Sequence, residues 1–331
     1  MTAVALAVRS RPLDTVGSWL RRNAWTMGLI GLLAALLVFT KASNPNYGAI
    51  GLQGLAISVL PLALAAVAQA IVVIAGGIDL SIGAMMAFTN VTAAVLMENS
   101  GEQAAVAIAI AIVVMGIVLG LINGGLVVLT RVPDIVVTLA MSFVWAGSAL
   151  LVLETPGGGA PQWLMNLVIG PFFNEWIPKA AVVLLALVAV VWFPLRRARL
   201  GLTLYAIGGN PLAAFRSGVA VGRTKILAYG LMGLFAGLAG LSLSASTGVG
   251  TPVPGPYTLM SVAAIVLGGV SLAGGRGGVF GPILAVVILQ LIRTDMTLLG
   301  VDTNAATVAQ GLILIGVVMV GSVIQLWRAR S

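Results

Sequence analysis

Ten apolar runs divide this sequence, each close to the roughly 20 residues that a helix needs to cross a membrane. We expect spans at about 24–40, 52–75, 82–97, 103–129, 134–153, 178–195, 226–246, 258–273, 279–299 and 305–326. Charged residues make up only 8% of the chain, far below the quarter or so that is usual in a soluble domain. The pattern predicts an all-α polytopic membrane protein with about ten transmembrane helices, in which 24–327 form one transmembrane domain after a short segment at 1–23.

The basic residues indicate how the chain is oriented. If the N-terminus is cytoplasmic and the spans alternate, the cytoplasmic loops hold fourteen of the 17 Lys and Arg residues: Arg9, Arg11, Arg21, Arg22, Arg131, Arg196, Arg197, Arg199, Arg216, Arg223, Lys225, Arg276, Arg328 and Arg330. The opposite loops hold only Lys41 and Lys179, and Arg293 falls within a span. This positive-inside asymmetry predicts a cytoplasmic segment at 1–23 and both termini in the cytoplasm. The net charge of +8 is then explained by topology and contact with anionic lipid, not by nucleic acid.

The cytoplasmic loop at 196–225 has an unusual sequence, because it carries six basic residues and no acidic residue. Asn210 is a favourable N-cap, Pro211 suits a first helical turn, and Gly218 is suited to close a short helix over Leu212 to Ser217. The positive-inside rule alone accounts for the arginines. It does not account for a capped helix, which favours a docking surface.

Two glycine-rich segments interrupt the apolar stretches. The first, GGIDLSIGA at 76–84, contains Asp79 and Ser81. A broken helix at membrane depth is tolerated where it is buried in protein or lines a cavity, and such breaks mark substrate sites in transporters. Asp79 is therefore either a residue of the translocation pathway or the N-cap of the span that begins at Leu80. The second segment, GGVSLAGGRGG at 268–278, repeats the pattern Gly-Gly-x-x-Leu-small.

Four further polar residues lie within predicted spans. Asn90 and Asn123 are candidates for the translocation pathway, although an amide in a span more often bonds a neighbouring helix. Arg293 and Asp295, near the outer end of the ninth span, either line the exit of the pathway or form a local pair with a snorkelling arginine.

The composition excludes several classes of chemistry. The chain has no Cys and no His, which removes thiol catalysis and histidine metal sites. It has no Ser-His-Asp set and no GxxxxGK[ST] phosphate loop, so we expect no catalytic residues, no metal site and no ATPase of its own.

Four segments together resemble the membrane permease subunits of bacterial ABC importers of the ribose, xylose and arabinose type. They are GGIDLSIGAMMAF (76–88), VPDIVVTLAMSFVWAGSALL (132–151), YAIGGNPLAAFRSGVAVGRTKILAYGLMGLFAGLAGL (205–241) and GGVSLAGGRGGVFGPILAVVI (268–288). Their order and spacing also fit, and the resemblance extends over roughly 50–325.

The resemblance implies a ten-span permease with the architecture of the vitamin-B12 importer, located in the bacterial inner membrane. It implies three protein partners: a second permease subunit, identical or a sister chain; a cytoplasmic ATPase that binds ATP and Mg²⁺; and a periplasmic sugar-binding protein. The ATPase-coupling helix of the family would fall on Asn210, Pro211, Ala213, Ala214, Arg216, Ser217 and Gly218. Translocation of a monosaccharide or similar small polar solute would proceed by alternating access, with no cofactor bound by this chain.

The chain departs from the family at two places. Tyr257-Thr258-Leu259 stands where relatives commonly have Tyr-Glu-Leu, and Ile292-Arg293-Thr294-Asp295 stands where they often have Leu-Asn-Asn-Gly. These changes leave the substrate open, a charged ligand included. The alternative function is an ion-coupled secondary transporter, for which Asp79 and Asp295 would be the titratable groups.

Overall fold

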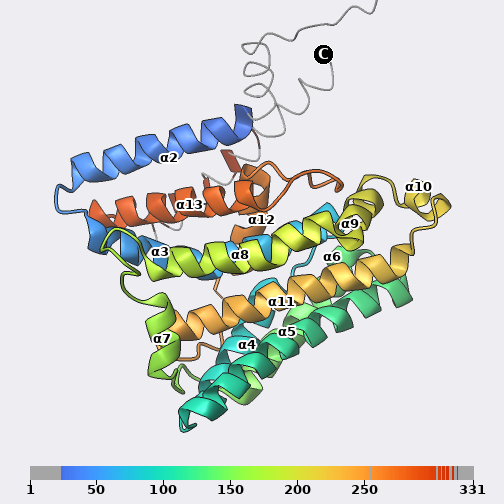
Figure 1. Cartoon of the computed structure of the whole chain (residues 1–331), viewed down its shortest axis with the longest axis horizontal. Helices are drawn as coiled ribbons and strands as arrows, with labels where there is room; N and C mark the ends of the chain where they lie inside the picture. The colour runs from blue at the N-terminus through green and yellow to red at the C-terminus, as the bar shows by residue number, and fades with distance from the viewer. Residues whose placement is uncertain are drawn as a thin grey trace, which may run out of the picture.

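A computed structural model of the chain describes residues 24–253, 255–302 and scattered positions between 305 and 319. The described residues form helices joined by loops, and most of the helices run side by side along the long axis of the molecule (Figure 1). The helices are α2 (Ala24–Ser43), α3 (Ala49–Ile74), α4 (Ile82–Met97), α5 (Glu102–Thr130), α6 (Asp134–Val152), α7 (Gln162–Val168), α8 (Lys179–Arg197), α9 (Arg199–Gly209), α10 (Pro211–Arg216), α11 (Val221–Thr247), α12 (Tyr257–Leu267) and α13 (Phe280–Leu298).

The helices confirm a polytopic membrane protein. Seven of those described are long and apolar enough to cross a membrane: α2, α3, α5, α6, α8, α11 and α13. The shorter apolar helices α4 and α12 fall on two more of the expected spans. The N-terminal segment 1–23 and most of the expected tenth span, 305–326, lie outside the described residues.

The expected end of the eighth span is wrong. The eighth span was expected over 258–273, but α12 ends at Leu267. Gly268 follows as the C-cap, and Gly269 has a φ of +79°, a conformation that glycine adopts freely and other residues rarely do. The residues from 268 to 279 therefore form a loop that leads into α13.

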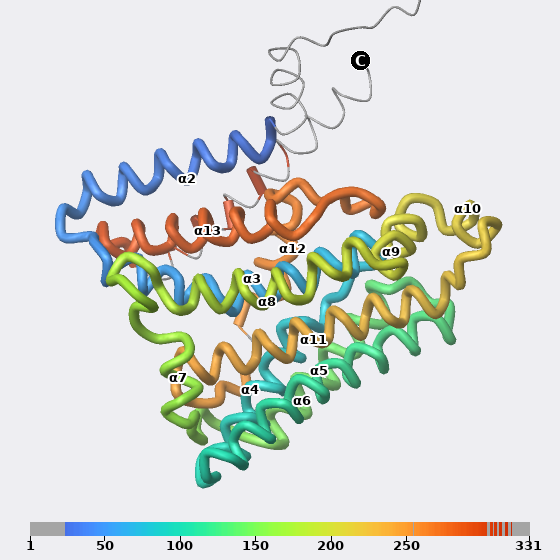
Figure 2. The backbone as a smooth tube through the Cα atoms, viewed as in Figure 1, coloured from blue at the N-terminus to red at the C-terminus, as the bar shows by residue number. Residues whose placement is uncertain are grey.

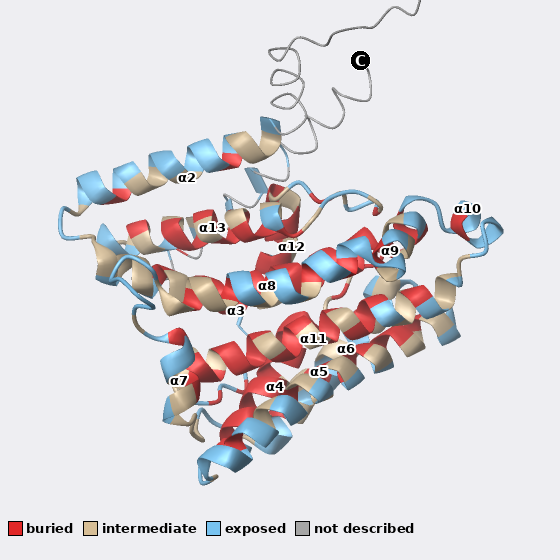
Figure 3. Ribbon diagram, viewed as in Figure 1, coloured by how far each residue is buried: buried red, intermediate tan, exposed pale blue. Residues whose placement is uncertain are grey.

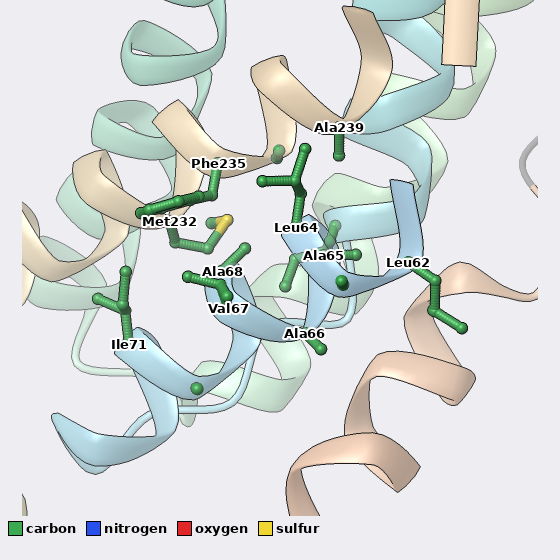
Figure 4. Close-up of a cluster of buried hydrophobic side chains, with 14 of the residues drawn as sticks. Leu62, Leu64, Ala65, Ala66, Val67, Ala68, Ile71, Met232, Phe235 and Ala239 are labelled. Atoms are coloured by element: carbon green, nitrogen blue, oxygen red, sulfur yellow. The ribbon is translucent and has the colours of Figure 1, made fainter. Parts of the chain in front are cut away.

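Helix α3 lies at the centre of the bundle. Its apolar window is 89% buried, whereas that of α2 is 11% buried and that of α6 is 22% buried. It packs against α11, α13, α12 and α8, and Figure 4 shows Leu64 and Ala68 of α3 close to Met232 and Phe235 of α11. The run LALAAVAQA supplies small side chains, and these allow neighbouring helices to approach closely.

Glycines hold α5 against α11. Gly116, Gly120 and Gly124 recur every four residues along α5 and all are buried. A Cβ on Gly116 would lie 2.9 Å from the Cα of Gly237, and one on Gly120 would lie 3.0 Å from the Cα of Gly233. Gly233 and Gly237 of α11 therefore serve close packing of two helices.

The bundle has two distinct ends. We call one the α10 end: it carries the turn between α5 and α6, helices α9 and α10, and the start of α11 (Figure 2). The opposite α7 end carries α7, the end of α11 and the end of α13. The segments at the α10 end contain Arg131, Arg196, Arg197, Arg199, Arg216, Arg223, Lys225 and Arg276. The basic residues expected in the cytoplasmic loops thus lie together, apart from those outside the described residues.

Candidate functional site

The most exposed candidate site is the short helix α10, and the local sequence explains why it forms. The side chain of Asn210 caps its N-terminus, because Oδ1 accepts a hydrogen bond from the N–H of Ala213 at 3.0 Å. Pro211 occupies the first turn, where its missing N–H costs nothing. Gly218 closes the helix at a φ of +83°. The predicted capped helix is confirmed, one residue earlier than expected at each end.

Helix α10 projects from the bundle with apolar side chains exposed. Leu212 is 58% exposed and Phe215 is 66% exposed, and Arg216 beside them is also exposed. Of the other predicted coupling residues, Ala213, Ser217 and Gly218 are exposed, while Ala214 is 5% exposed and anchors the helix (Figure 3). An apolar pair rimmed by polar groups on a basic surface is typical of a protein interaction site.

A glycine junction connects α10 to the body of the protein. It consists of Gly76 after α3, Gly208 in α9, and Gly274 and Gly275 in the loop before α13. A Cβ on Gly76 would lie 3.3 Å from the Cα of Gly208, and one on Gly274 would lie 3.0 Å from the Cα of Gly76. The N–H of Gly275 donates a hydrogen bond to the carbonyl of Ile74 at 2.9 Å. The two glycine-rich breaks noticed in the sequence therefore meet in space, against the helix that leads into α10.

The first break also contains a buried polar network around Asp79. The Asp79 carboxylate accepts hydrogen bonds from the N–H of Ser81 at 2.6 Å, from the Ser81 hydroxyl at 2.7 Å, and from Asn123 Nδ2 at 3.2 Å. The amide oxygen of Asn123 in turn accepts from the indole N–H of Trp145 at 3.2 Å. Asp79, Ser81 and Asn123 are completely buried. In this arrangement they fasten the segment between α3 and α4 to α5 and α6.

The cap role considered for Asp79 needs refinement. Helix α4 begins at Ile82, and Ser81 is its N-cap residue without a side-chain hydrogen bond to the helix. Asp79 instead bonds the backbone two residues on, which satisfies an N–H just before the helix starts. The pathway role of Asp79, Ser81 and Asn123 stays a prediction.

A second polar cluster beside this network was not anticipated from the sequence. Lys225 Nζ in α11 and Asp134 Oδ1 in α6 form an ion pair at 2.7 Å. The hydroxyl of Tyr229 donates to the other oxygen of Asp134 at 2.9 Å. Thr138 Oγ1 accepts from the N–H of Leu80, so the break is bonded to α6 as well. Two sequence features could have indicated this cluster: Asp134 directly follows Pro133, and Lys225 lies about one turn after the start of α11.

Asn90 joins three parts of the α7 end. Its side-chain Nδ2 donates to Ser244 Oγ at 2.8 Å, and its Oδ1 accepts from the N–H of Thr251 at 2.7 Å. Asn90 is completely buried. The geometry supports the helix-bonding alternative in this conformation, and a contact with substrate stays a prediction.

Arg293 and Asp295 lie in different surroundings. Arg293 lines a pocket of about 480 Å³ between α3, α11, α12 and α13. Asp295 is 6% exposed and lies close to Thr40 of α2. Its Oδ2 atom has no hydrogen-bond partner among the described residues. The sequence placed the two residues together, whereas the structure brings Arg293 to this pocket and buries Asp295 beside α2.

The sequence itself decides the family. A profile of the family described as "Branched-chain amino acid transport system / permease component" matches residues 51–323. The chain belongs to this permease family. It is therefore the permease component of an ATP-binding-cassette importer, a multi-pass protein of bacterial inner-membrane type and not itself an enzyme.

The matches to curated relatives extend over nearly the whole permease. It is similar to the ribose import permease protein RbsC of Escherichia coli K12, with 31% identity over 313 residues, which are 90% of this chain and 94% of the relative. It is 32% identical to RbsC of Bacillus subtilis 168 over 86% of this chain and 88% of the relative. It is 30% identical to the autoinducer 2 import system permease protein LsrD of E. coli K12 over 93% and 94%. No solved structure matches the permease.

Membership in this family implies a separate ATPase and a binding protein as partners, and no cofactor in the permease itself. Family membership does not identify the imported solute. Relatives at about 30% identity include importers of ribose and of autoinducer 2. The substrate of this permease has to be argued from its own residues.

Proposed function

We propose that this permease imports a monosaccharide or a similarly small polar solute by alternating access, driven by an ATPase that docks on α10. The observation that carries the proposal is the exposed apolar pair Leu212 and Phe215 on a capped helix, with Arg216 beside them. Two of the relatives are named as import permeases for ribose and for autoinducer 2, and this supports a small polar solute as the substrate.

The positions of charge support the orientation. The α10 end would be cytoplasmic, because the basic residues lie there, and both termini would lie on the same side. The acidic residues Glu98, Glu102, Glu154 and Glu175 fall in segments at the α7 end, which would face the periplasm and the solute-binding protein. A second permease subunit, identical or a sister chain, would complete the translocation pathway.

The glycine junction provides a route for coupling. Movement of α10 would pass through α9 to Gly208, which contacts both glycine-rich breaks through backbone atoms. One of these breaks carries Asp79, and the other leads into α13, which carries Arg293. ATP binding shifts the transporter between two arrangements only if the ATPase binds one of them better.

The test is a gentle detergent pull-down of the tagged permease from native membranes, followed by mass spectrometry. An ATPase with a phosphate loop should be recovered in near-equal amount with the wild type and lost with Arg216→Glu. Arg197→Glu is the matched control, because it reverses an exposed charge at the same end of the bundle but not on α10. It should retain the ATPase.

Two results would overturn the proposal. One is full ATPase recovery and full solute uptake with Arg216→Glu. The other is a permease that purifies alone after crosslinking and drives uptake in vesicles from a proton gradient without ATP. The second result would support the ion-coupled transporter instead.

A further inference from the structure

The Arg293 pocket lies at the α7 end of the bundle, opposite the proposed ATPase site. Helix α11 starts beside α10 and reaches this pocket in its last turn, where Ser246 and Thr247 line it. Helix α3 contributes Ser58 from its first half, and α13 contributes Gln290, Arg293 and Thr294 from its second half. With about 480 Å³ the pocket falls within the size range of small-molecule sites.

The hydroxyl groups of the pocket present hydrogen-bond acceptors. Ser246 Oγ and Thr247 Oγ1 donate to the carbonyl of Leu243 at 3.0 and 2.8 Å, and Thr294 Oγ1 donates to the carbonyl of Gln290 at 2.9 Å. Each hydroxyl has one donor and two acceptor lone pairs. Because these three donors are already used within the helices, the oxygens of Ser246, Thr247 and Thr294 are left as acceptors, which suit the O–H groups of a polyol.

The charged donor of the pocket is the Arg293 guanidinium, and the Tyr257 hydroxyl is a neutral one. Its lining residues include no Asp and no Glu. Among the described residues an ion pair joins Lys225 to Asp134 at the α10 end of the bundle, far from Arg293. Asp295 is buried towards α2. Arg293 has no carboxylate partner among the described residues. Its guanidinium therefore offers a planar fork of N–H groups, which matches carboxylate or phosphate with two parallel hydrogen bonds.

We propose that the Arg293 pocket binds a small solute that carries one carboxylate or phosphate beside several hydroxyl groups, such as a sugar acid or a sugar phosphate. This deepens the proposed function and rests on it, because the pocket would receive the solute at the periplasmic end. An anionic phospholipid presents the same phosphate and hydroxyl chemistry, so the experiment must separate the two sources.

The experiment measures thermal unfolding of the full-length permease in phosphatidylcholine nanodiscs at constant ionic strength. The probes are gluconate, a six-carbon polyhydroxy carboxylate, and sorbitol, its neutral counterpart. Gluconate at a tenfold excess over its Kd should raise the Tm of the wild type by about 2–4 °C. Sorbitol at the same concentration should raise it clearly less.

Two variants show whether Arg293 is responsible. Arg293→Gln should lose the difference between gluconate and sorbitol, and Arg293→Lys should keep part of it, because the charge remains and the planar fork is lost. Arg197→Gln, an exposed arginine at the other end, should behave as the wild type. Each variant is compared with itself without ligand, so a change in folding does not imitate loss of binding.

Three results would overturn the proposal. Equal shifts with gluconate and sorbitol, or an unchanged gluconate shift in Arg293→Gln, would remove the anion site. Stabilisation by phosphatidylglycerol nanodiscs that depends on Arg293, without any gluconate effect, would assign the pocket to lipid. The assay needs neither ATPase nor binding protein, so its failure would leave docking on α10 standing, and failure of the pull-down would leave this pocket standing.

Discussion

Replacing Gly208 by Ala should destabilise the permease, because the glycine junction has no room for a methyl group. A Cβ at this position would overlap the carbonyl oxygen of Ile74 and lie 2.6 Å from the backbone nitrogen of Gly275. Comfortable separations are about 3.5 Å, so α9 would have to retreat by more than about 1 Å to clear both atoms. Overpacking of this kind costs about 1–3 kcal/mol.

A second contribution comes from the hydrogen bond between the N–H of Gly275 and the carbonyl of Ile74, because the added methyl group would press on both of its atoms and force them apart. Its loss adds about 1 kcal/mol. The sum of about 2–4 kcal/mol corresponds to a decrease in Tm of about 5 °C or more. The measurement is heating of the tagged, detergent-solubilised permease, followed by size-exclusion chromatography of the material that stays monodisperse.

The adjacent glycine provides the matched control. A Cβ on Gly209 would meet nothing within 4 Å. Gly209→Ala should therefore leave the Tm unchanged or slightly raised, because Ala favours the helix over Gly by about 0.5–1 kcal/mol. Equal Tm values for Gly208→Ala and Gly209→Ala would refute the idea that backbone contact at the junction holds α9 in place.

Three further predictions concern the polar contacts. Asn210→Ala removes the cap of α10 at a cost of about 1 kcal/mol, so amide exchange in α10 should accelerate, whereas Asn210→Asp keeps the cap and the slow exchange. Asp134→Asn and Lys225→Met should each lower the Tm, and the Tm of the double variant should fall by less than the sum of the two single decreases. Strictly additive decreases would show that the ion pair does not couple α6 to α11. Asn90→Ala leaves the N–H of Thr251 without its partner, so limited proteolysis should cut at 249–253 faster than in the wild type, and an unchanged cleavage rate would contradict the bonding role of Asn90.

Hydropathy and cap chemistry predicted most of the elements. The apolar runs located nine of the expected spans, with the start of α11 and the end of α12 each misplaced by several residues. The Asn-Pro-to-Gly pattern located α10 almost to the residue. Both signals are local, since they depend on residues within a few turns of one another. Local signals were therefore sufficient for the spans and for the helix of the proposed docking site, whereas α7 and α9 were not anticipated.

The arrangement of the helices was not predictable in this way. Lipid tails are as apolar as Leu, so hydropathy does not separate the central helix α3 from the peripheral helix α6. The partners Asp134 and Lys225 are 91 positions apart, and the glycine junction brings together three segments that are distant in the sequence. These contacts depend on the packing of the whole bundle.

The central position of α3 has a consequence for how the protein is made. Helix α3 ends at Ile74, and its main neighbour α11 starts at Val221, 147 positions later. At about 5–20 residues per second, the ribosome needs on the order of 10 s to supply that neighbour. During this interval α3 must wait in lipid. Most residues of α3 are Ala, Val, Leu and Ile, which tolerate both environments because lipid tails and neighbouring side chains are similarly apolar. The composition that suits the centre of the finished bundle thus also suits the nascent chain.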